Sequence, residues 1–186
     1  MLFRSEKIGD WRWSDNLFTR QRELNGLRVI MALINNWDLK DENNAIYEEK
    51  HGASGTPELH YAVSDLGASF GTPGRSLTHS MSKGNLKAYQ HSRFIHKKTS
   101  EYVDFYVPSR PALIYLATPK EYFSRVDMRW IGRHIPRSDA QWIGGLLAEL
   151  SPDQIRDAFC AAGYTPAQVN AYALVVEKRI AELKQL

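Results

Sequence analysis

The spacing of apolar residues predicts a long helix in the first quarter of the chain. Ser14 or Asp15 can cap this helix, which should run to about Asn35. Its apolar residues recur at helical spacing and cover most of its surface, as in a core helix: Leu24, Leu27, Ile30, Met31 and Ile34. The helix should therefore lead the chain directly into the polar stretch that follows it.

Two short segments after this stretch predict a β-hairpin. The strand candidates are residues 45–49 and 59–64, and the sequence between them, Gly52-Ala53-Ser54-Gly55-Thr56-Pro57, is typical of a turn. Residues 67–85 are rich in Gly, Ser and Thr and should form a loop. Residues 86–107 mix basic and aromatic side chains, which indicates some extended structure.

Capping signals predict helices in the C-terminal part. Ser151-Pro152-Asp153-Gln154 and Thr165-Pro166-Ala167-Gln168 are capping boxes with proline at the first helical position. Gly163 suits the end of the first of these helices, and the second should reach about Lys184. Two further helices are expected earlier, over residues 118–130 and 138–149. The chain is thus expected to be an α+β protein, predominantly α, with residues 1–186 in a single domain.

The composition allows one sizeable core and restricts the chemistry. The chain has 186 residues, 43% of them hydrophobic, with a net charge of +3 and a pI near 8.9. Cys160 is the only cysteine, which excludes an intrachain disulfide, and it should be a small buried residue. No apolar run approaches the roughly 18 residues of a membrane span. The N-terminus lacks the apolar core of a signal peptide, so a cytoplasmic protein is the default expectation.

Positive charge is concentrated in one segment. Between Asp65 and Glu101 there is no acidic residue, and the segment carries +6 from Arg75, Lys83, Lys87, Arg93, Lys97 and Lys98. Such a segment favours a polyanionic partner such as phosphate, an acidic peptide or nucleic acid. Binding of nucleic acid is one alternative function, because aromatic residues are interleaved with the basic ones: Tyr89, Phe94, Tyr102 and Phe105.

The polar stretch after the first helix carries the candidate chemistry. Its sequence is Asn36-Trp37-Asp38-Leu39-Lys40-Asp41-Glu42-Asn43-Asn44, and Asp65-Leu66-Gly67 follows the predicted hairpin. Asp and Asn supply the hard oxygen ligands that Mg²⁺ requires. They also favour turns, which is an alternative explanation of the residue types but not of their order.

This ordered set resembles the catalytic floor of the C-terminal lobe of a protein-kinase-like fold. The sequence Asn36-Trp37-Asp38 looks most like that of atypical bacterial kinases of the CotH and HipA types. The resemblance implies an ATP- and Mg²⁺-dependent phosphotransferase that acts on a protein or small-molecule hydroxyl. It implies that Asp38 is the catalytic base and that Lys40 contacts the transferring phosphoryl group. Asn43 and Asp65 would then bind Mg²⁺ and nucleotide, with Gly67 in the same nucleotide-binding element.

The sequence departs from conventional kinases at several points. Asn36-Trp37 stand where His-Arg precedes the catalytic Asp, Leu66 replaces Phe, and no Ala-Pro-Glu follows. Asp38 and Asp65 lie 27 residues apart, a longer separation that the turn at 52–57 could absorb. The glycine-rich hairpin and paired lysine of an N-terminal lobe are missing from the 37 residues before Asp38.

The missing lobe leaves three interpretations open. The chain is a fragment or truncated form, or a partner chain supplies the lid, and in both cases the chain alone should be weakly active or inactive. Alternatively, it is an inactive pseudokinase or scaffold that binds an acidic partner. Three histidines in the basic segment could coordinate a metal, but their spacing favours solvated side chains: His79, His91 and His96.

Overall fold

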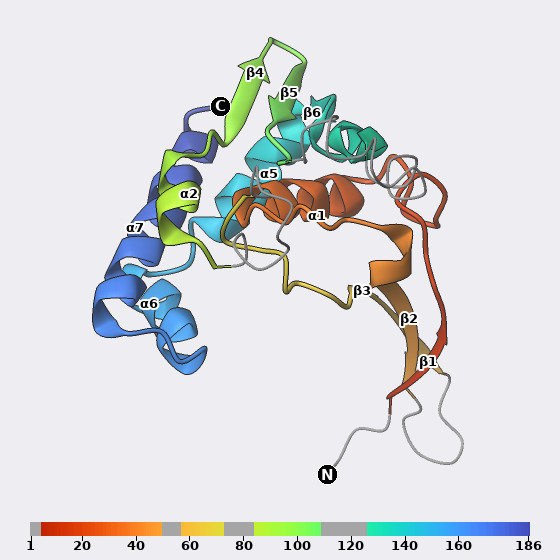
Figure 1. The fold of residues 1–186 in the computed structure, drawn as a ribbon. Helices are drawn as coiled ribbons and strands as arrows, with labels where there is room; N and C mark the ends of the chain where they lie inside the picture. Colours follow the sequence, from red (N-terminus) through yellow and green to blue (C-terminus); the bar gives the residue numbers. More distant parts are fainter. Residues whose placement is uncertain (1–4, 50–56, 73–83, 109–125) are drawn as a thin grey trace.

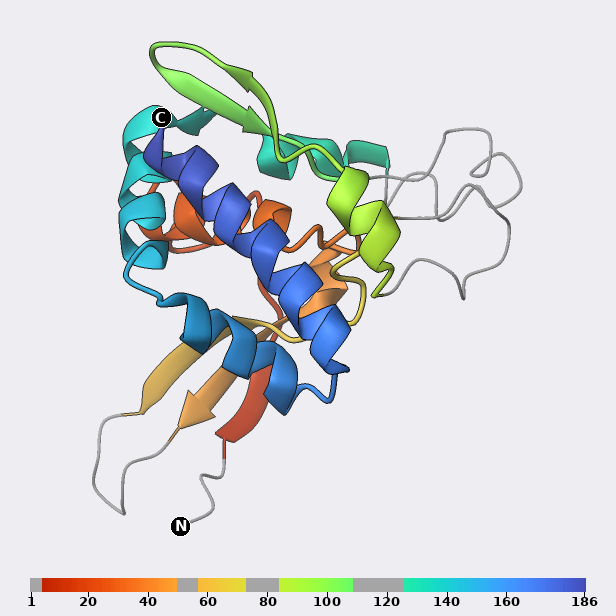
Figure 2. The same cartoon turned by 90° about the vertical axis from the view of Figure 1, so that its left-hand side faces the viewer.

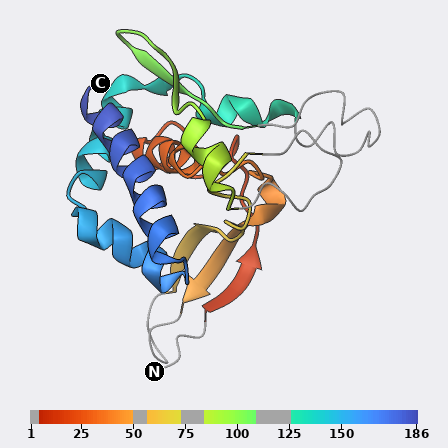
Figure 3. The ribbon, with the colours of Figure 1, turned by 60° about the vertical axis from the view of Figure 1, so that its left-hand side comes forward.

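The computed structural model describes residues 5–49, 57–72, 84–108 and 126–186. In these ranges the chain forms five α-helices and two three-stranded antiparallel sheets, which confirms the predicted α+β class. The sheets lie at opposite ends of the molecule, with helix α1 (Arg22–Leu33) between them (Figures 1 and 3).

The first sheet has three strands where a hairpin of two was predicted. Its strands, in the order β1-β2-β3, are β1 (Ser5–Gly9), β2 (Asn44–Glu49) and β3 (Glu58–Val63). The β2–β3 pair is the predicted hairpin, within one residue at each end, and Ile46 pairs with Tyr61. Most of the predicted turn between them lies outside the described residues. Strand β1 escaped prediction because Ile8 is its one large apolar residue, so it shows no alternation.

The first helix is shorter than predicted, and the expected start near Ser14 was wrong. Residues 14–20 form turns instead. The side-chain oxygen of Asn16 accepts the backbone N–H of Phe18 at 2.8 Å, a local bond that competes with a helix. Arg20 then adopts a φ of 71°, which no right-handed helix contains, and α1 begins after it.

The second sheet, in the order β4-β5-β6, consists of β4 (Ile95–Lys98), β5 (Tyr102–Phe105) and β6 (Ile135–Pro136). Strands β4 and β5 confirm the extended structure predicted for residues 86–107. The start of that segment differs, because α2 (Leu86–His91) is a helix that Asn85 caps by accepting the N–H of Ala88 at 3.0 Å. Of the predicted helix 118–130, only the end is described, and it belongs to the 3₁₀ helix η3 (Val126–Gly132).

The C-terminal helices follow the sequence closely. They are α5 (Arg137–Leu147), α6 (Pro152–Ala161) and α7 (Pro166–Lys184). Both predicted capping boxes are formed, with Ser151 capping α6 and Thr165 capping α7. Gly163 follows α6 with a φ of 82°, a conformation that favours glycine. Figure 2 shows α7 running across the molecule beside α5 and α6.

The core lies where α1, α5 and α7 pack together. Two close approaches explain glycines inside these helices. A Cβ on Gly26 would lie 2.9 Å from the Trp142 ring, and a Cβ on Gly144 would lie 2.8 Å from the Leu183 Cβ. Glycine lowers helix propensity, so its presence here is explained by packing.

The prediction that Cys160 is buried was wrong. Helix α6 buries Ile155 and Phe159, while Cys160, one position further along, is exposed. Successive helical positions differ by about 100°, so one side of a short helix is covered while the next position faces solvent.

Candidate active site

Two segments between α1 and the first sheet carry every predicted site residue. The first, residues 34–44, joins α1 to β2, and the second, residues 64–72, follows β3 (Figure 1). Backbone hydrogen bonds join the segments: Ser64 N to Asn43 O (2.7 Å), Trp37 N to Ala68 O (3.3 Å) and Phe70 N to Ile34 O (2.7 Å). Residues that are far apart in the sequence are therefore held side by side.

Asn36 connects the loop of Asp38 with that of Asp65. Its side chain is fully buried. The Oδ1 atom accepts the backbone N–H of Asp38 at 3.0 Å, and Nδ2 donates to the backbone carbonyl of Asp65 at 3.4 Å. Asn35 precedes it with a φ of 54°, a left-handed conformation that ends α1. One amide side chain thus fixes both loops in a common frame.

The side chains of Asn43 and Asp65 each use one polar atom in a hydrogen bond within the protein. Asn43 Nδ2 donates to the backbone carbonyl of Asp38 at 2.6 Å, which leaves its Oδ1 for another contact. Asp65 Oδ1 accepts the backbone N–H of Gly67 at 2.8 Å, which leaves its Oδ2. Asp65 is exposed, so its Oδ2 atom can be reached from solvent. Both remaining atoms are hard oxygen ligands of the kind Mg²⁺ binds.

Lys40 lies beside the proposed base. Its Nζ atom is 3.6 Å from Asp38 Oδ1, and both side chains are largely but not fully buried. The two side chains therefore form an ion pair at the edge of the loop.

The N-terminal segment supports the same loop from the other side. Asp41 Oδ1 accepts the backbone N–H of Trp13 at 3.1 Å, and Asn44 Nδ2 donates to the carbonyl of Trp11 at 3.1 Å. The indole N–H of Trp11 in turn donates to the carbonyl of Ala62 at 3.0 Å. Asp41 and Asn44 therefore have structural roles within the motif.

Arg179, on α7, anchors the loop from the core. Only 2% of it is exposed. Its guanidinium donates to Asn35 Oδ1 (2.8 Å), to the carbonyl of Leu33 (2.7 Å) and to the Ser92 hydroxyl (2.7 Å). Its carbon Cζ also lies 4.2 Å from the centre of the Tyr89 ring. The guanidinium therefore holds the C-terminal end of α1 by hydrogen bonds and by a cation–π contact with the Tyr89 ring.

Burial changes the acid–base behaviour of this cluster. It lowers the pKa of Arg179 and raises the pKa of Tyr89 to about 12, because both charged forms lose hydration. The Tyr89 hydroxyl donates to the carbonyl of Leu33 at 2.7 Å.

We expect Tyr89 to make the fold sensitive to alkali. An acid whose pKa rises on folding contributes stability below its unfolded pKa of about 10, and this is lost as pH rises towards about 12. At pH 11 the loss attributable to Tyr89 should be about 1.4 kcal/mol. Urea unfolding of the wild type and Tyr89→Phe between pH 8 and pH 11 measures it, since Phe cannot titrate. Parallel pH profiles for the two proteins would contradict the prediction.

The predicted metal site contains few carboxylates. Within the described ranges no group of three or more His, Cys, Asp or Glu residues could hold a metal ion. The predicted oxygen donors are Asp38, Asn43 and Asp65. Only two of them are acidic, so they do not make up a group of three. Mg²⁺ often keeps several waters and takes only one or two carboxylates from the protein, and the residues present fit that requirement.

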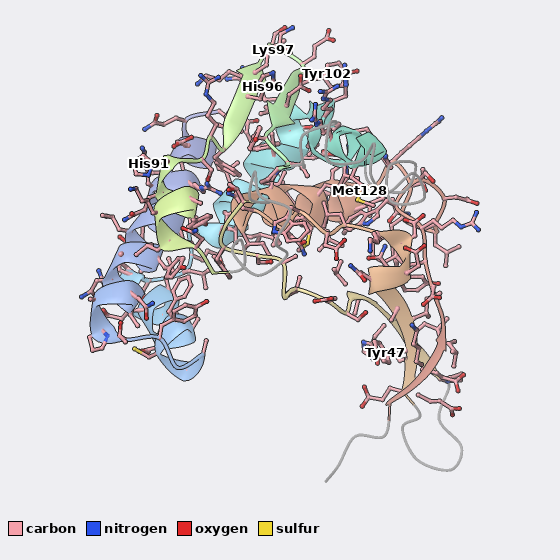
Figure 4. The ribbon with its side chains drawn as sticks, viewed as in Figure 1. Tyr47, His91, His96, Lys97, Tyr102 and Met128 are labelled. Atoms are coloured by element: carbon pink, nitrogen blue, oxygen red, sulfur yellow. The ribbon has the colours of Figure 1, made fainter. Side chains whose placement is uncertain are left out.

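The other sequence-predicted candidates do not form a common site. His91 and His96 are exposed on separate elements, α2 and β4 (Figure 4), and His79 lies outside the described residues. Of the aromatic residues expected to contact nucleic acid, Tyr102 is exposed, but the others are core residues: Tyr89, Phe94 and Phe105. The aromatic surface that nucleic-acid binding would need is therefore not formed by these residues. Two of the basic residues predicted to contact nucleic acid, Arg75 and Lys83, lie outside the described ranges.

Asn36 and Arg179 are the residues that sequence reasoning missed. Arg179 had a recognisable signal, because it follows Tyr172 and Val176 on one helical face and precedes Leu183 on that face. An arginine on such an apolar helical face indicates that its guanidinium is buried and hydrogen-bonded to several groups in the core. Asn36 offered no comparable pattern.

Comparison with protein-family models, with curated proteins and with solved structures found no match. Among the described segments, none of the helices combines the length and apolar character needed to cross a bilayer.

Proposed function

We propose that this chain carries the catalytic loop of a phosphotransferase that uses ATP and Mg²⁺ to phosphorylate a hydroxyl group. The main support is that Asn36 binds both Asp38 and Asp65, while Asn43 donates to Asp38. The backbones of Asp38 and Asp65 and the side chain of Asn43 thus belong to one hydrogen-bonded network. Turn formation by Asp and Asn does not require a link across 29 positions, such as that from Asn36 to Asp65.

The reaction assigns a distinct role to each side chain. The acceptor hydroxyl oxygen bonds to the γ-phosphorus as the bond from that phosphorus to the bridging oxygen breaks, and ADP leaves. The hydroxyl proton passes to the Asp38 carboxylate. Lys40 orients that carboxylate and offsets negative charge on the transferring group.

Asn43 Oδ1 and Asp65 Oδ2 would hold the metal. When held by these residues, Mg²⁺ would supply positive charge to offset that on the phosphate oxygens. The protein's own contribution is preorganisation, because both ligand residues are fixed by hydrogen bonds before any ligand arrives.

Calorimetric titration with Mg²⁺–ATP tests the proposal. The folded chain should bind the nucleotide in the presence of Mg²⁺ and much more weakly with EDTA. Asn43→Ala should weaken binding at least tenfold, about 1.4 kcal/mol, by removing a metal ligand.

Glu42→Gln is the matched control, because Glu42 is an exposed neighbour in the same turn, and its affinity should stay within twofold of the wild type. Circular dichroism checks that each variant is folded. A folded wild type that gives no heat with millimolar Mg²⁺–ATP would contradict nucleotide binding by this loop and favour a non-catalytic scaffold.

A further inference from the structure

A cavity of about 530 Å³ opens beside the Asp65 loop. One wall comes from the residues that follow Asp65, namely Leu66, Gly67 and Phe70. The opposite wall comes from the C-terminal end of α6: Ala158, Phe159 and Ala162. The cavity thus lies between the proposed metal-binding loop and a helix far away in the sequence.

The lining suits an apolar group with a flat or bulky shape. Phe70 and Phe159 meet edge to face with ring centres 5.3 Å apart, and Tyr164 packs on Phe159 at 5.7 Å. Small residues on both walls leave the space open. Aromatic and small apolar linings of this kind bind rings and large aliphatic groups.

A further observation indicates that the cavity receives a ligand. Leu66, which lines it, is 49% exposed, although a large apolar residue gains by being covered. Ser69 also lines the cavity and is largely buried. An apolar group seated in the cavity would cover Leu66.

The cavity adjoins the proposed reaction centre. Gly67, in its wall, donates its N–H to Asp65 Oδ1 at 2.8 Å. The Cα atoms of these two residues can be at most roughly 7.6 Å apart along the backbone. A group bound in the cavity therefore lies next to the carboxylate that would hold the metal.

We propose that this cavity is an acceptor subsite, which binds an aromatic or large aliphatic side chain of a peptide substrate. This inference rests on the proposed function. The lining has no charged residue, so the cavity selects an apolar group and leaves the reacting hydroxyl to lie outside it. Two or three residues of extended peptide span roughly 7–10 Å, enough to separate an anchoring side chain from the Ser, Thr or Tyr that is phosphorylated.

Filling the cavity tests the proposal. Ala162→Leu adds a side chain to its wall, and Ala161→Leu, at an exposed neighbouring position outside the lining, is the matched control. The substrate is a set of peptide pools with a central Ser, Thr or Tyr, each with one flanking position fixed as Phe, Leu, Ala or Asp. Phosphate incorporation from Mg²⁺–ATP is measured for each pool. Amide NMR shifts of Gly67 and Ser69 are recorded during titration with N-acetyl-phenylalaninamide.

We expect at least fivefold faster phosphorylation of the Phe or Leu pool than of the Asp pool at one flanking position. Ala162→Leu should abolish this preference and the NMR shifts, whereas Ala161→Leu should retain both. Phosphorylation without any preference, or an unchanged preference in Ala162→Leu, overturns the subsite while leaving the phosphotransferase intact. If the wild type neither binds Mg²⁺–ATP nor phosphorylates any pool, the proposed function fails and the acceptor role fails with it.

Discussion

Replacing Asp65 with alanine should lower the rate of phosphoryl transfer by about a thousandfold or more, equivalent to about 4 kcal/mol of transition-state stabilisation. The proposed role of this carboxylate is to bind the metal through Oδ2, and no neighbouring acidic side chain in the described residues completes a metal-binding group in its place. A radiometric transfer assay with Mg²⁺–ATP measures the effect. An unchanged rate in the variant would end the proposal.

Asp65→Asn separates chemistry from folding. Asparagine retains an oxygen for the N–H of Gly67 but removes the negative charge. We expect its rate to be nearly as low as that of Asp65→Ala, with little change in the free energy of unfolding. Asp10→Ala, an exposed carboxylate just after β1, should keep the wild-type rate. Recovery of activity in Asp65→Asn would show that Asp65 acts only by shaping the turn.

Arg179→Met should lower the free energy of unfolding by about 3–5 kcal/mol. Methionine fills similar space but leaves the buried Asn35 Oδ1 without its donor. It also removes the guanidinium bonds to the Leu33 carbonyl and the Ser92 hydroxyl, which keep Tyr89 and Asn35 as their other donors. Buried polar atoms without partners are among the few causes of such large losses. Guanidinium unfolding monitored by tryptophan fluorescence measures the change.

Lys178→Met is the control on the same helix. Lys178 is exposed, so this change should alter stability by no more than about 0.5 kcal/mol. Arg179→Lys keeps a positive charge but loses the planar fork, and we expect a loss between those of the other two variants. If Arg179→Met were as stable as Lys178→Met, the guanidinium would not anchor the loop.

Local signals predicted the fold wherever a few neighbouring residues determine the structure. The capping residues Ser151 and Thr165 predicted the starts of α6 and α7 because each cap is a contact between residues three positions apart. The β2–β3 hairpin was predicted for a similar reason. Strand β1 was not, since it exists only through pairing with residues about 40 positions away.

The candidate site also contains some residues that the sequence predicted and others that it did not. The motif residues Asp38, Asn43 and Asp65 could be selected because their order along the chain is itself informative. What holds them could not be derived, because Asn36 reaches Asp65 across 29 positions. Arg179 reaches Asn35 across 144 positions, and only the folded chain shows that contact. The roles of these motif residues in phosphoryl transfer stay predictions.

The separation of Arg179 from Asn35 by 144 positions along the chain has a consequence for biosynthesis. Translation adds about 5–20 residues per second, and a chain folds as its segments emerge. The loop around Asp38 is made early, but the arginine that anchors it leaves the ribosome many seconds later. A ribosome-bound nascent chain halted before α7 should therefore expose this loop to protease, and protection should appear only when α7 has been added.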